Sequence, residues 1–245
     1  MTPYAEGERW MLYAGDALDV LPELTASRFA AIVTDPPYAS AGGNTNGRES
    51  GADTQFWRHW FGSVWRNCEE VLNPDGCGFV FSDWRMINAL AAAVSGGIDR
   101  GQRARSWQMS QALVWDRRNI GLGAPFRAGF EMIGFVRGPT WKHDETLIPR
   151  NLPAVIAHPF AYGSHPNHGA EKPVDLLAKL IGFSSRAGDG LLDPFAGSGS
   201  TGVAAIQMGR RFTGIEREPG YLAVAARRLA DAAAGGTQLR LGDTA

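Results

Sequence analysis

Residues 34–38 read Thr-Asp-Pro-Pro-Tyr and come straight after an apolar run. The side chain of Asp35 can accept a hydrogen bond, and so can the main-chain carbonyl of Pro36. Pro36 and Pro37 have fixed φ angles and restrict the residue before them, so this carbonyl is held in place. Tyr38 offers a ring that can stack on a flat ligand. An acid, a rigid carbonyl and a ring together suit the capture of a planar amine, such as the exocyclic amine of a nucleobase.

Such an amine is a poor nucleophile because its lone pair is delocalised into the ring. Acceptors on both N–H groups would make the nitrogen more tetrahedral and therefore more reactive as a new bond forms. Asp35 and Pro36 are the candidate catalytic acceptors, supported by Pro37 and Tyr38. The alternative is a turn in which the prolines end a strand and Tyr38 packs into the core.

A second stretch, residues 190–216, passes from an apolar run through a glycine-rich turn into a helix pattern and a second apolar run. Its glycines 197, 199 and 202 have the spacing of a nucleotide-binding turn, in which the backbone bends sharply and approaches a ligand closely. Glu216 ends the second apolar run, where a carboxylate can bind a ribose diol. The pattern indicates a nucleoside-bearing cofactor. A nicotinamide cofactor and a turn that serves only packing both remain open.

Two details of this stretch favour S-adenosylmethionine. Asp193 lies between the first apolar run and the glycines, and its carboxylate suits a cationic, amino-bearing ligand but repels a pyrophosphate. Phe195 offers an apolar surface for an adenosine. The candidate cofactor-binding residues of this stretch are Asp193, Phe195, Ala196, Gly197, Ser198, Gly199, Ser200, Thr201 and Glu216.

Strand and helix patterns alternate along the chain and must position both motifs. Strand patterns occupy residues 10–13, 29–34, 78–82, 106–115, 130–136, 190–193 and 212–216. Helix patterns occupy residues 17–24, 54–72, 86–94, 173–183, 201–208 and 219–234. This alternation predicts an α/β fold with a mostly parallel sheet covered by helices on both faces, in which ligands bind beyond the carboxyl ends of the strands. Asp35 and Asp193 both follow such ends.

Composition and charge exclude several classes of protein. The 245 residues suit one domain, and no apolar run is long enough to span a membrane. We see no secretory signal, and two cysteines do not make a disulfide framework, so a cytoplasmic location is expected. His165 and His168 form a lone pair without nearby cysteine, so no metal is expected. Residues 85–150 carry 10 basic and 5 acidic side chains, a net charge of +5 that suits phosphate contacts but also a solvated surface.

The two motifs together resemble those of the DNA amino-methyltransferases, which methylate adenine N6 or cytosine N4 with S-adenosylmethionine. The order of the motifs, with DPPY before DPFAGSG, resembles the circularly permuted beta group of that family. The resemblance extends to the Gly-Asp segment near residue 16, to residues 77–138 and to the Lys-Pro helix start at residue 172. It implies a Rossmann-like sheet of the seven-stranded type and adds Asp16, Ala17, Asp35 and Lys172 to the residues near the cofactor.

The resemblance also implies a substrate. The aspartate form of the motif leans toward adenine N6 in this family, so we expect methylation of an adenine flipped out of double-stranded DNA, with cytosine N4 or a nicotinamide-dependent oxidoreductase as alternatives. Residues 138–169 would be a small target-recognition segment and residues 39–53 a mobile loop over the active site, both within one domain spanning residues 1–245. A homodimer is expected.

Overall fold

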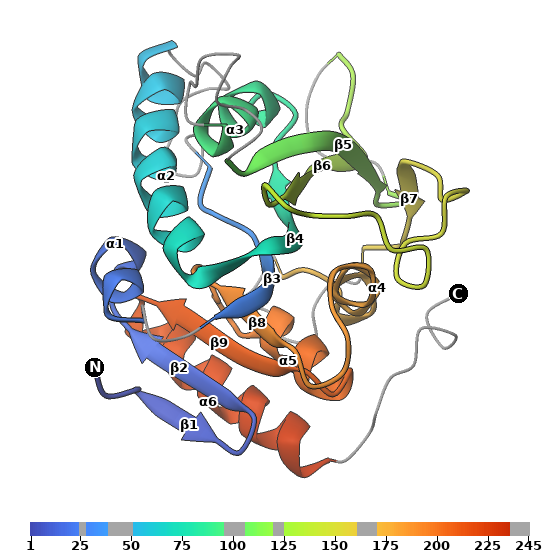
Figure 1. The fold of residues 1–245 in the computed structure, drawn as a ribbon. Coiled ribbons are helices and arrows are strands. Elements are labelled where there is room, and N and C mark those ends of the chain that lie inside the picture. Colours follow the sequence, from blue (N-terminus) through green and yellow to red (C-terminus); the bar gives the residue numbers. More distant parts are fainter. Residues whose placement is uncertain (25–27, 39–50, 96–105, 120–124, 161–170, 236–245) are drawn as a thin grey trace.

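One large sheet organises the fold (Figure 1). The computed structural model describes residues 1–24, 28–38, 51–95, 106–119, 125–160 and 171–235, with the side chains of α2 described from residue 54. Within this part, nine strands follow the order β1-β2-β9-β8-β3-β4-β6-β5-β7. The strands are β1 Ala5–Gly7, β2 Trp10–Ala14, β3 Phe29–Thr34, β4 Leu72–Ser82, β5 Gln108–Asp116, β6 Phe130–Arg137, β7 Val155–Ala157, β8 Gly190–Asp193 and β9 Arg211–Glu216.

The centre of the sheet is parallel: β2, β9, β8, β3 and β4 all pair in parallel. The strand β6 runs antiparallel to both β4 and β5, β1 runs antiparallel to β2, and β7 is parallel to β5. The helices are α1 Ala17–Val20, continued by a 3-10 turn at Leu21–Leu24, α2 Gly51–Val71, α3 Ile87–Val94, α4 Val174–Ser184, α5 Ser200–Gln207 and α6 Pro219–Ala234.

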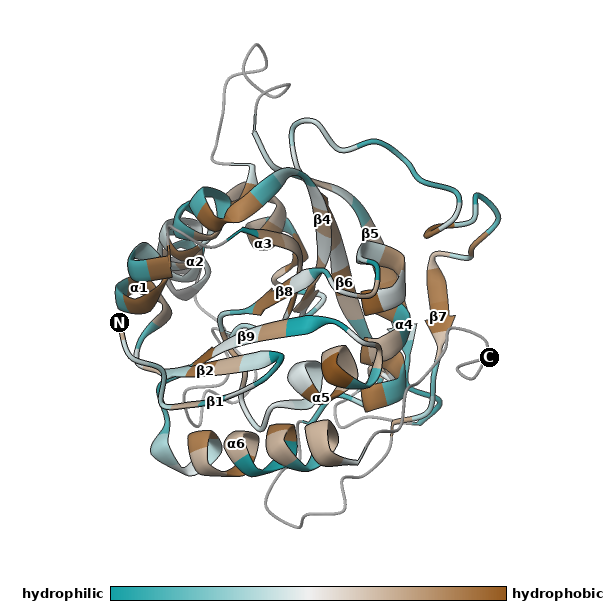
Figure 2. Ribbon diagram, turned by 60° about the horizontal axis from the view of Figure 1, so that its bottom comes forward, coloured by the Kyte–Doolittle hydropathy of each residue, from teal (hydrophilic) through white to brown (hydrophobic). Residues whose placement is uncertain are grey.

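Helices cover both faces because the central strands are apolar on both faces. Along β3, Ala31 and Val33 face the core beneath α4, α5 and α6, whereas Ile32 faces the core beneath α1, α2 and α3. Figure 2 shows polar residues interleaved with apolar ones along α6, whose buried residues recur at spacings of three and four.

The first and the last strands of the described chain lie together in one half of the sheet. Figure 1 shows the N-terminal strand β2 beside the C-terminal β9, which pairs on its other side with β8, and the register pairs Trp10 with Phe212. From β8 the chain winds through α5 to β9, and from the adjacent β3 it winds the opposite way through α2 to β4. The neighbours β8 and β3 therefore form the point at which the winding reverses, where α/β sheets open a crevice at the carboxyl ends of their strands.

The predicted α/β fold class is confirmed, but several boundaries differ. The sheet has nine strands rather than the seven expected, because β1 and β7 add three residues each at its edges. The helix α2 begins at Gly51, so the expected loop of residues 39–53 overlaps it; residues 39–50 lie outside the described residues. The polar start of α2 carries no apolar period by which its beginning could be recognised.

Other sequence expectations concern segments of which the structure describes only a part. Of residues 138–169, the described part carries β7, which pairs with the end of β5 at the sheet edge. His165 and His168 lie outside the described residues, so the expectation that they bind no metal stays a prediction. None of the described helices combines the length and apolar character needed to cross a membrane.

Candidate active site

The two acidic strand ends lie side by side. The strands β3 and β8 pair in parallel, with Ala31 opposite Leu191. This register brings the hydroxyl of Thr34 within 2.7 Å of Asp193 Oδ1, to which it donates a hydrogen bond. The motif that follows β3 and the glycine turn that follows β8 therefore open into one cavity.

The glycine turn depends on backbone conformations that other residues rarely adopt. Gly197 and Gly199 have φ angles of 52° and 84°. The amide of Gly199 donates to the carbonyl of Ala196 at 2.8 Å, and a Cβ on Gly199 would lie 3.1 Å from Ala225 of α6. The turn is thus both tight and pressed against α6, and α5 begins directly after it.

Backbone amides fix the carboxylate of Glu216 at the end of β9. Its Oε2 accepts from the amide of Gly197 at 2.8 Å, and its Oε1 accepts from those of Arg217 and Glu218, both at 2.9 Å. Each carboxylate oxygen has two lone pairs, so Oε2 keeps capacity for a ligand hydroxyl. Glu216 is therefore a positioned acceptor at the rim of the glycine turn.

Asp193 is a buried acid, only 2% exposed. Burial raises the pKa of its carboxyl to about 6, although hydrogen bonds from Thr34, Thr201 and the amide of Phe195 oppose the shift. Its charge is therefore sensitive to what enters the cavity, because a cation nearby would stabilise the ionised form.

Asp35 has both carboxylate oxygens occupied. Oδ1 accepts from the hydroxyl of Tyr38 at 2.7 Å, and Oδ2 accepts from the ammonium of Lys172 at 2.5 Å. Burial, followed by the charges of Asp35 and Glu131, raises the pKa of Tyr38 well above its ordinary value, so this hydroxyl stays a donor. The expected stacking of the Tyr38 ring on a base stays a prediction.

Aromatic side chains of α2 shape both motifs, which the sequence had not indicated. The indole of Trp57 donates to the carbonyl of Pro37 at 2.6 Å. Trp60 and Phe61 pack against Phe195, with ring centroids 5.5 and 6.4 Å apart respectively. Trp57 and Phe61 belong to the core beneath α2, and Trp60 packs against it, so this part of the core also borders the site.

A group of contacts around Glu171, which the sequence did not indicate, stabilises the glycine turn. Glu171 accepts from the hydroxyl of Ser200 at 2.9 Å and forms an ion pair with Arg228 of α6. Arg228 in turn donates to the carbonyl of Ser198 at 3.0 Å. The residue before Lys172 therefore ties the glycine turn to α6.

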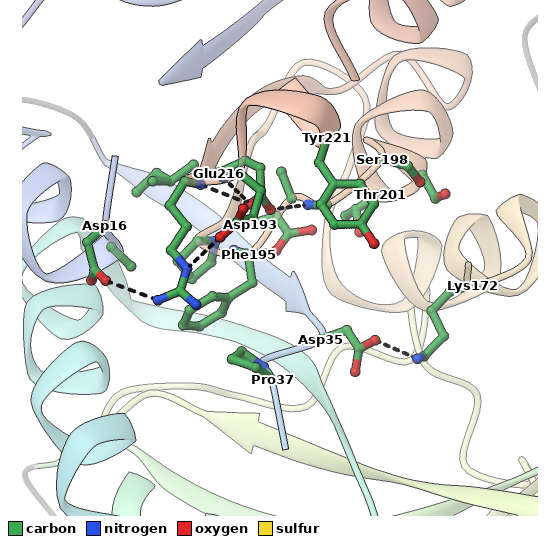
Figure 3. A pocket seen from close by; sticks show the side chains of 18 of the residues that line it. Asp16, Asp35, Pro37, Lys172, Asp193, Phe195, Ser198, Thr201, Glu216 and Tyr221 are labelled. Atoms are coloured by element: carbon green, nitrogen blue, oxygen red, sulfur yellow. Dashed lines mark hydrogen bonds and ion pairs between the residues drawn. The ribbon is translucent and has the colours of Figure 1, made fainter. Parts of the chain in front are cut away.

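A single cavity of about 500 Å³ contains most of the predicted residues (Figure 3). Its lining includes Asp16, Ala17, Asp35, Pro37, Lys172, Asp193, Phe195, Ala196, Gly197, Ser198, Ser200, Thr201 and Glu216. Pro36, Tyr38 and Gly199 do not line it. Unpredicted lining comes from Gly15, Trp60, Glu171, Leu177, Pro194, Ile215, Arg217, Glu218 and Tyr221. In Figure 3 Asp35 lies between Lys172 and the group formed by Asp193 and Phe195.

Comparisons with known proteins indicate a class of enzyme. A family model described as DNA methylase, for the N6 and N4 enzymes, matches residues 141–227. The type II methyltransferase M2.DpnII of Streptococcus pneumoniae is 27% identical over 93% of this chain and 92% of its own length. These similarities support a DNA amino-methyltransferase that uses S-adenosylmethionine.

Further relatives of this DNA amino-methyltransferase fit the same pattern. The DNA adenine methyltransferase YhdJ of Escherichia coli is 28% identical over 88% of this chain and 81% of its own length. Two solved structures share the fold. M1.HpyAVI in complex with SAM has a TM-score of 0.69 at 23% identity, covering 90% of this chain and 98% of its own. The cytosine-N4-specific PvuII methyltransferase has a TM-score of 0.71 at 18% identity, covering 92% and 88%.

Asp193→Asn is expected to stabilise the folded methyltransferase at pH 8 by on the order of 1–3 kcal/mol. A carboxyl whose pKa is raised to about 6 in the folded state favours folding most at low pH and loses that contribution as pH rises through 6. Asn keeps an oxygen for Thr34 and has no charge to bury. Urea unfolding at pH 4.5 and pH 8 measures the effect.

The control for this prediction is Asp175→Asn, an exposed acid in the first turn of α4. We expect no comparable gain there. An Asp193→Asn variant with the same advantage at both pH values would contradict the proposed burial of charge.

Proposed function

We propose that this DNA methyltransferase transfers the methyl group of S-adenosylmethionine to the N6 amine of adenine in double-stranded DNA. The observation that carries the proposal is the shared cavity, which is lined both by Asp35 and by residues 197 and 198 of the glycine turn. A cofactor held by the turn and a base held by Asp35 would then meet in one place.

The residues of the cavity fit S-adenosylmethionine. A volume of about 500 Å³ lies within the range of cavities that hold such ligands. Asp193 and Asp16 give it negative charge for a sulfonium and an amino group, Glu216 gives a fixed acceptor for a ribose diol, and Phe195 an apolar wall. When bound, the cofactor supplies an electrophilic methyl group.

The chain's own groups would prepare the amine. Asp35 accepts a hydrogen bond from one N–H of the target amine and the Pro36 carbonyl accepts from the other, which localises the lone pair on nitrogen. The indole of Trp57 donates a hydrogen bond to the neighbouring Pro37 carbonyl, which restricts rotation of the backbone at this position. The methylated amine carries positive charge next to Asp35 until its surplus proton leaves to solvent. No strong base is required.

The choice of adenine over cytosine rests on two supports. The motif has the aspartate form, and among the relatives, YhdJ is named as an adenine enzyme. The likeness to the cytosine-N4-specific PvuII enzyme, at 18% identity, concerns the fold alone. A nicotinamide cofactor is disfavoured because the buried carboxylate of Asp193 lies beside the turn, where its charge would oppose a pyrophosphate.

The direct test is methylation of unmethylated genomic DNA with labelled S-adenosylmethionine, followed by digestion to nucleosides and mass spectrometry. We expect N6-methyladenine, and sequencing with detection of modified bases would give the recognition sequence. N4-methylcytosine as the product would overturn the adenine assignment. A lack of any methylated base, with cofactor binding intact, would overturn the proposed function.

A DNA-facing edge is proposed at the carboxyl end of the sheet. Asp116 of β5 pairs with Phe130 of β6, so the connection between them leaves the sheet at the same edge as Asp35. This connection carries Arg118, whose φ of 54° is uncommon for a residue other than glycine, and Phe126, which is 93% exposed. An exposed ring and a basic side chain in a strained backbone suit contact with a nucleic acid.

Arg118→Asn is expected to reduce the slope of log affinity for duplex DNA against log salt concentration by about one, because one phosphate contact is lost. Asn tolerates the left-handed backbone, which keeps the connection intact. Fluorescence anisotropy at several salt concentrations measures the slope. Arg227→Gln, an exposed arginine of α6, is the control and should leave the slope unchanged. Equal slopes for wild type and Arg118→Asn would place the phosphate contacts elsewhere.

The remaining expectations stay predictions. These are a homodimer, a cytoplasmic location, and a single domain in which residues 138–169 read the target.

A further inference from the structure

The ammonium group of Lys172 lies between two carboxylates that come from different parts of the sheet. It donates to Asp35 Oδ2 at 2.5 Å and forms an ion pair with Glu131 Oε2 at 3.3 Å. The Lys172 side chain is 9% exposed, compared with 30% for Asp35 and 17% for Glu131. Lys172 precedes α4, whereas Asp35 follows β3 and Glu131 belongs to β6.

This environment keeps the lysine charged. Burial alone would lower the pKa of Lys172, but the charges of Asp35 and Glu131 and their hydrogen bonds raise it above its ordinary value. The ammonium also lies 5.2 Å from the ring centroid of Phe81, a cation–π contact. A buried ammonium is tolerated only with such partners, so its place is closely specified.

The second carboxylate is itself held. Arg117 forms an ion pair with Glu131 Oε1 at 3.3 Å and donates to the carbonyl of Ala128 at 2.8 Å. The charges of Asp35, Lys172, Glu131 and Arg117 therefore alternate from the end of β3 to the connection between β5 and β6. Because each charge has an opposite neighbour, removal of one member would leave a partner buried without compensation.

These ion pairs leave the ammonium of Lys172 little capacity to bind the cofactor. Its ammonium donates a hydrogen bond to Asp35 and forms an ion pair with Glu131, so two carboxylates already compete for its charge. A free ammonium in the cavity would also repel a cationic ligand, whereas one neutralised by Asp35 and Glu131 would not. The hydroxyl of Tyr38 holds the other oxygen of Asp35, so together the two donors fix the plane of its carboxylate.

We propose that Lys172, anchored by Glu131 and Arg117, is a positioning residue that orients the Asp35 carboxylate for the target amine, rather than a ligand of the cofactor. Each oxygen of Asp35 retains a second lone pair that can accept a hydrogen bond. Lys172 and Tyr38 set the orientation of the carboxylate so that one of these lone pairs faces the amine of the incoming base. The inference rests on the proposed function, because it concerns the orientation of Asp35 toward a base.

The test uses the full chain with Lys172→Met, which keeps a long side chain without charge, and Lys172→Arg. For Lys172→Met we expect the single-turnover rate of DNA methylation at saturating cofactor to fall about 100-fold. The dissociation constant for S-adenosylmethionine, measured by calorimetry, should change less than about threefold because the cofactor contacts remain. Lys172→Arg should recover part of the rate. Lys179→Met, a half-buried lysine of α4, should behave as wild type.

Chemical rescue separates positioning from general damage. In Lys172→Ala, added propylammonium should enter the space left by the side chain and raise the rate several-fold, with no effect on wild type. The calorimetric signal also reports whether each variant is folded.

Several outcomes would overturn the inference. A large loss of cofactor affinity with an unchanged rate at saturation would make Lys172 a cofactor ligand. An unchanged rate in Lys172→Met beside an active wild type would remove its role and leave the proposed function standing. If wild type itself does not methylate DNA, the proposed function fails first and the positioning role with it.

Discussion

Asp35→Asn is expected to lower the single-turnover rate of DNA methylation by about 1,000-fold while changing the dissociation constant for S-adenosylmethionine by less than about fivefold. Asn keeps the shape of the side chain but loses the charge, and its NH2 group cannot accept from Lys172 or from a target amine. The ammonium of Lys172 would retain only Glu131 as an anionic partner. The cofactor residues of the glycine turn are not altered. The loss should therefore appear in the chemical step.

The matched control for this prediction is again Asp175→Asn, which removes an exposed carboxylate from α4 and should methylate DNA at the wild-type rate. Thermal unfolding of both variants separates catalysis from folding, since Asp35→Asn also disturbs a buried ion pair. An Asp35→Asn enzyme with at least a tenth of the wild-type rate would remove the carboxylate from the mechanism. A rate loss that disappears at high cofactor concentration would instead place Asp35 in cofactor binding.

The parts of the site that sequence predicted are those set by local chemistry. The prolines after Asp35 restrict the backbone φ angles, and the glycines after Asp193 allow positive φ angles. Both motifs directly follow apolar strands. Parallel strands end at one edge of a sheet, so the sequence also placed the two acids at the same edge. The structure adds that β3 and β8 are direct neighbours, which follows from strand order and not from either motif.

The parts that sequence missed depend on contacts between distant residues. Lys172 and Asp35 are separated by 137 positions, and Arg228 lies 30 positions from Ser198, so no spacing rule connects them. Lys172 was expected near the cofactor, and it does line the cavity, but its ammonium is directed to Asp35. In the sequence, Lys172 was marked only by the resemblance of its Lys-Pro pair to that of the family, which did not indicate its partner.

The edges of the fold were missed for a different reason. The strands β1 and β7 have three residues each, too few to show the alternation by which strands are recognised. Conversely, the bounds expected for α6 are those observed, because a proline marks its start and a glycine follows its end. Proline and glycine therefore predict the ends of a helix well, whereas the pairing of a short edge strand depends on the strand beside it, which local sequence does not show.

Gly199→Val is expected to raise the dissociation constant for S-adenosylmethionine at least about 100-fold, corresponding to a loss of about 3 kcal/mol. The φ of 84° at this position is unfavourable for a β-branched residue, and its Cβ would lie 3.1 Å from Ala225. The turn cannot keep its shape, so the amides of Gly197 and the neighbouring residues would move relative to Glu216. Because Gly199 does not itself line the cavity, the loss would come from the shape of the turn rather than from a lost contact.

The control that makes this prediction decisive is Gly220→Val in the first turn of α6, where nothing lies within 4 Å of an added Cβ. This variant changes the same residue types outside the turn and should bind the cofactor as wild type does. Calorimetry gives both dissociation constants, and the unfolding temperature of Gly199→Val shows whether the fold survives. If Gly199→Val remains folded and binds with wild-type affinity, the glycine turn does not hold the cofactor. The cavity lined by Asp35 and the turn would then bind another kind of ligand. A nucleoside-bearing molecule in this cavity would depend on the backbone conformation of residues 197–199.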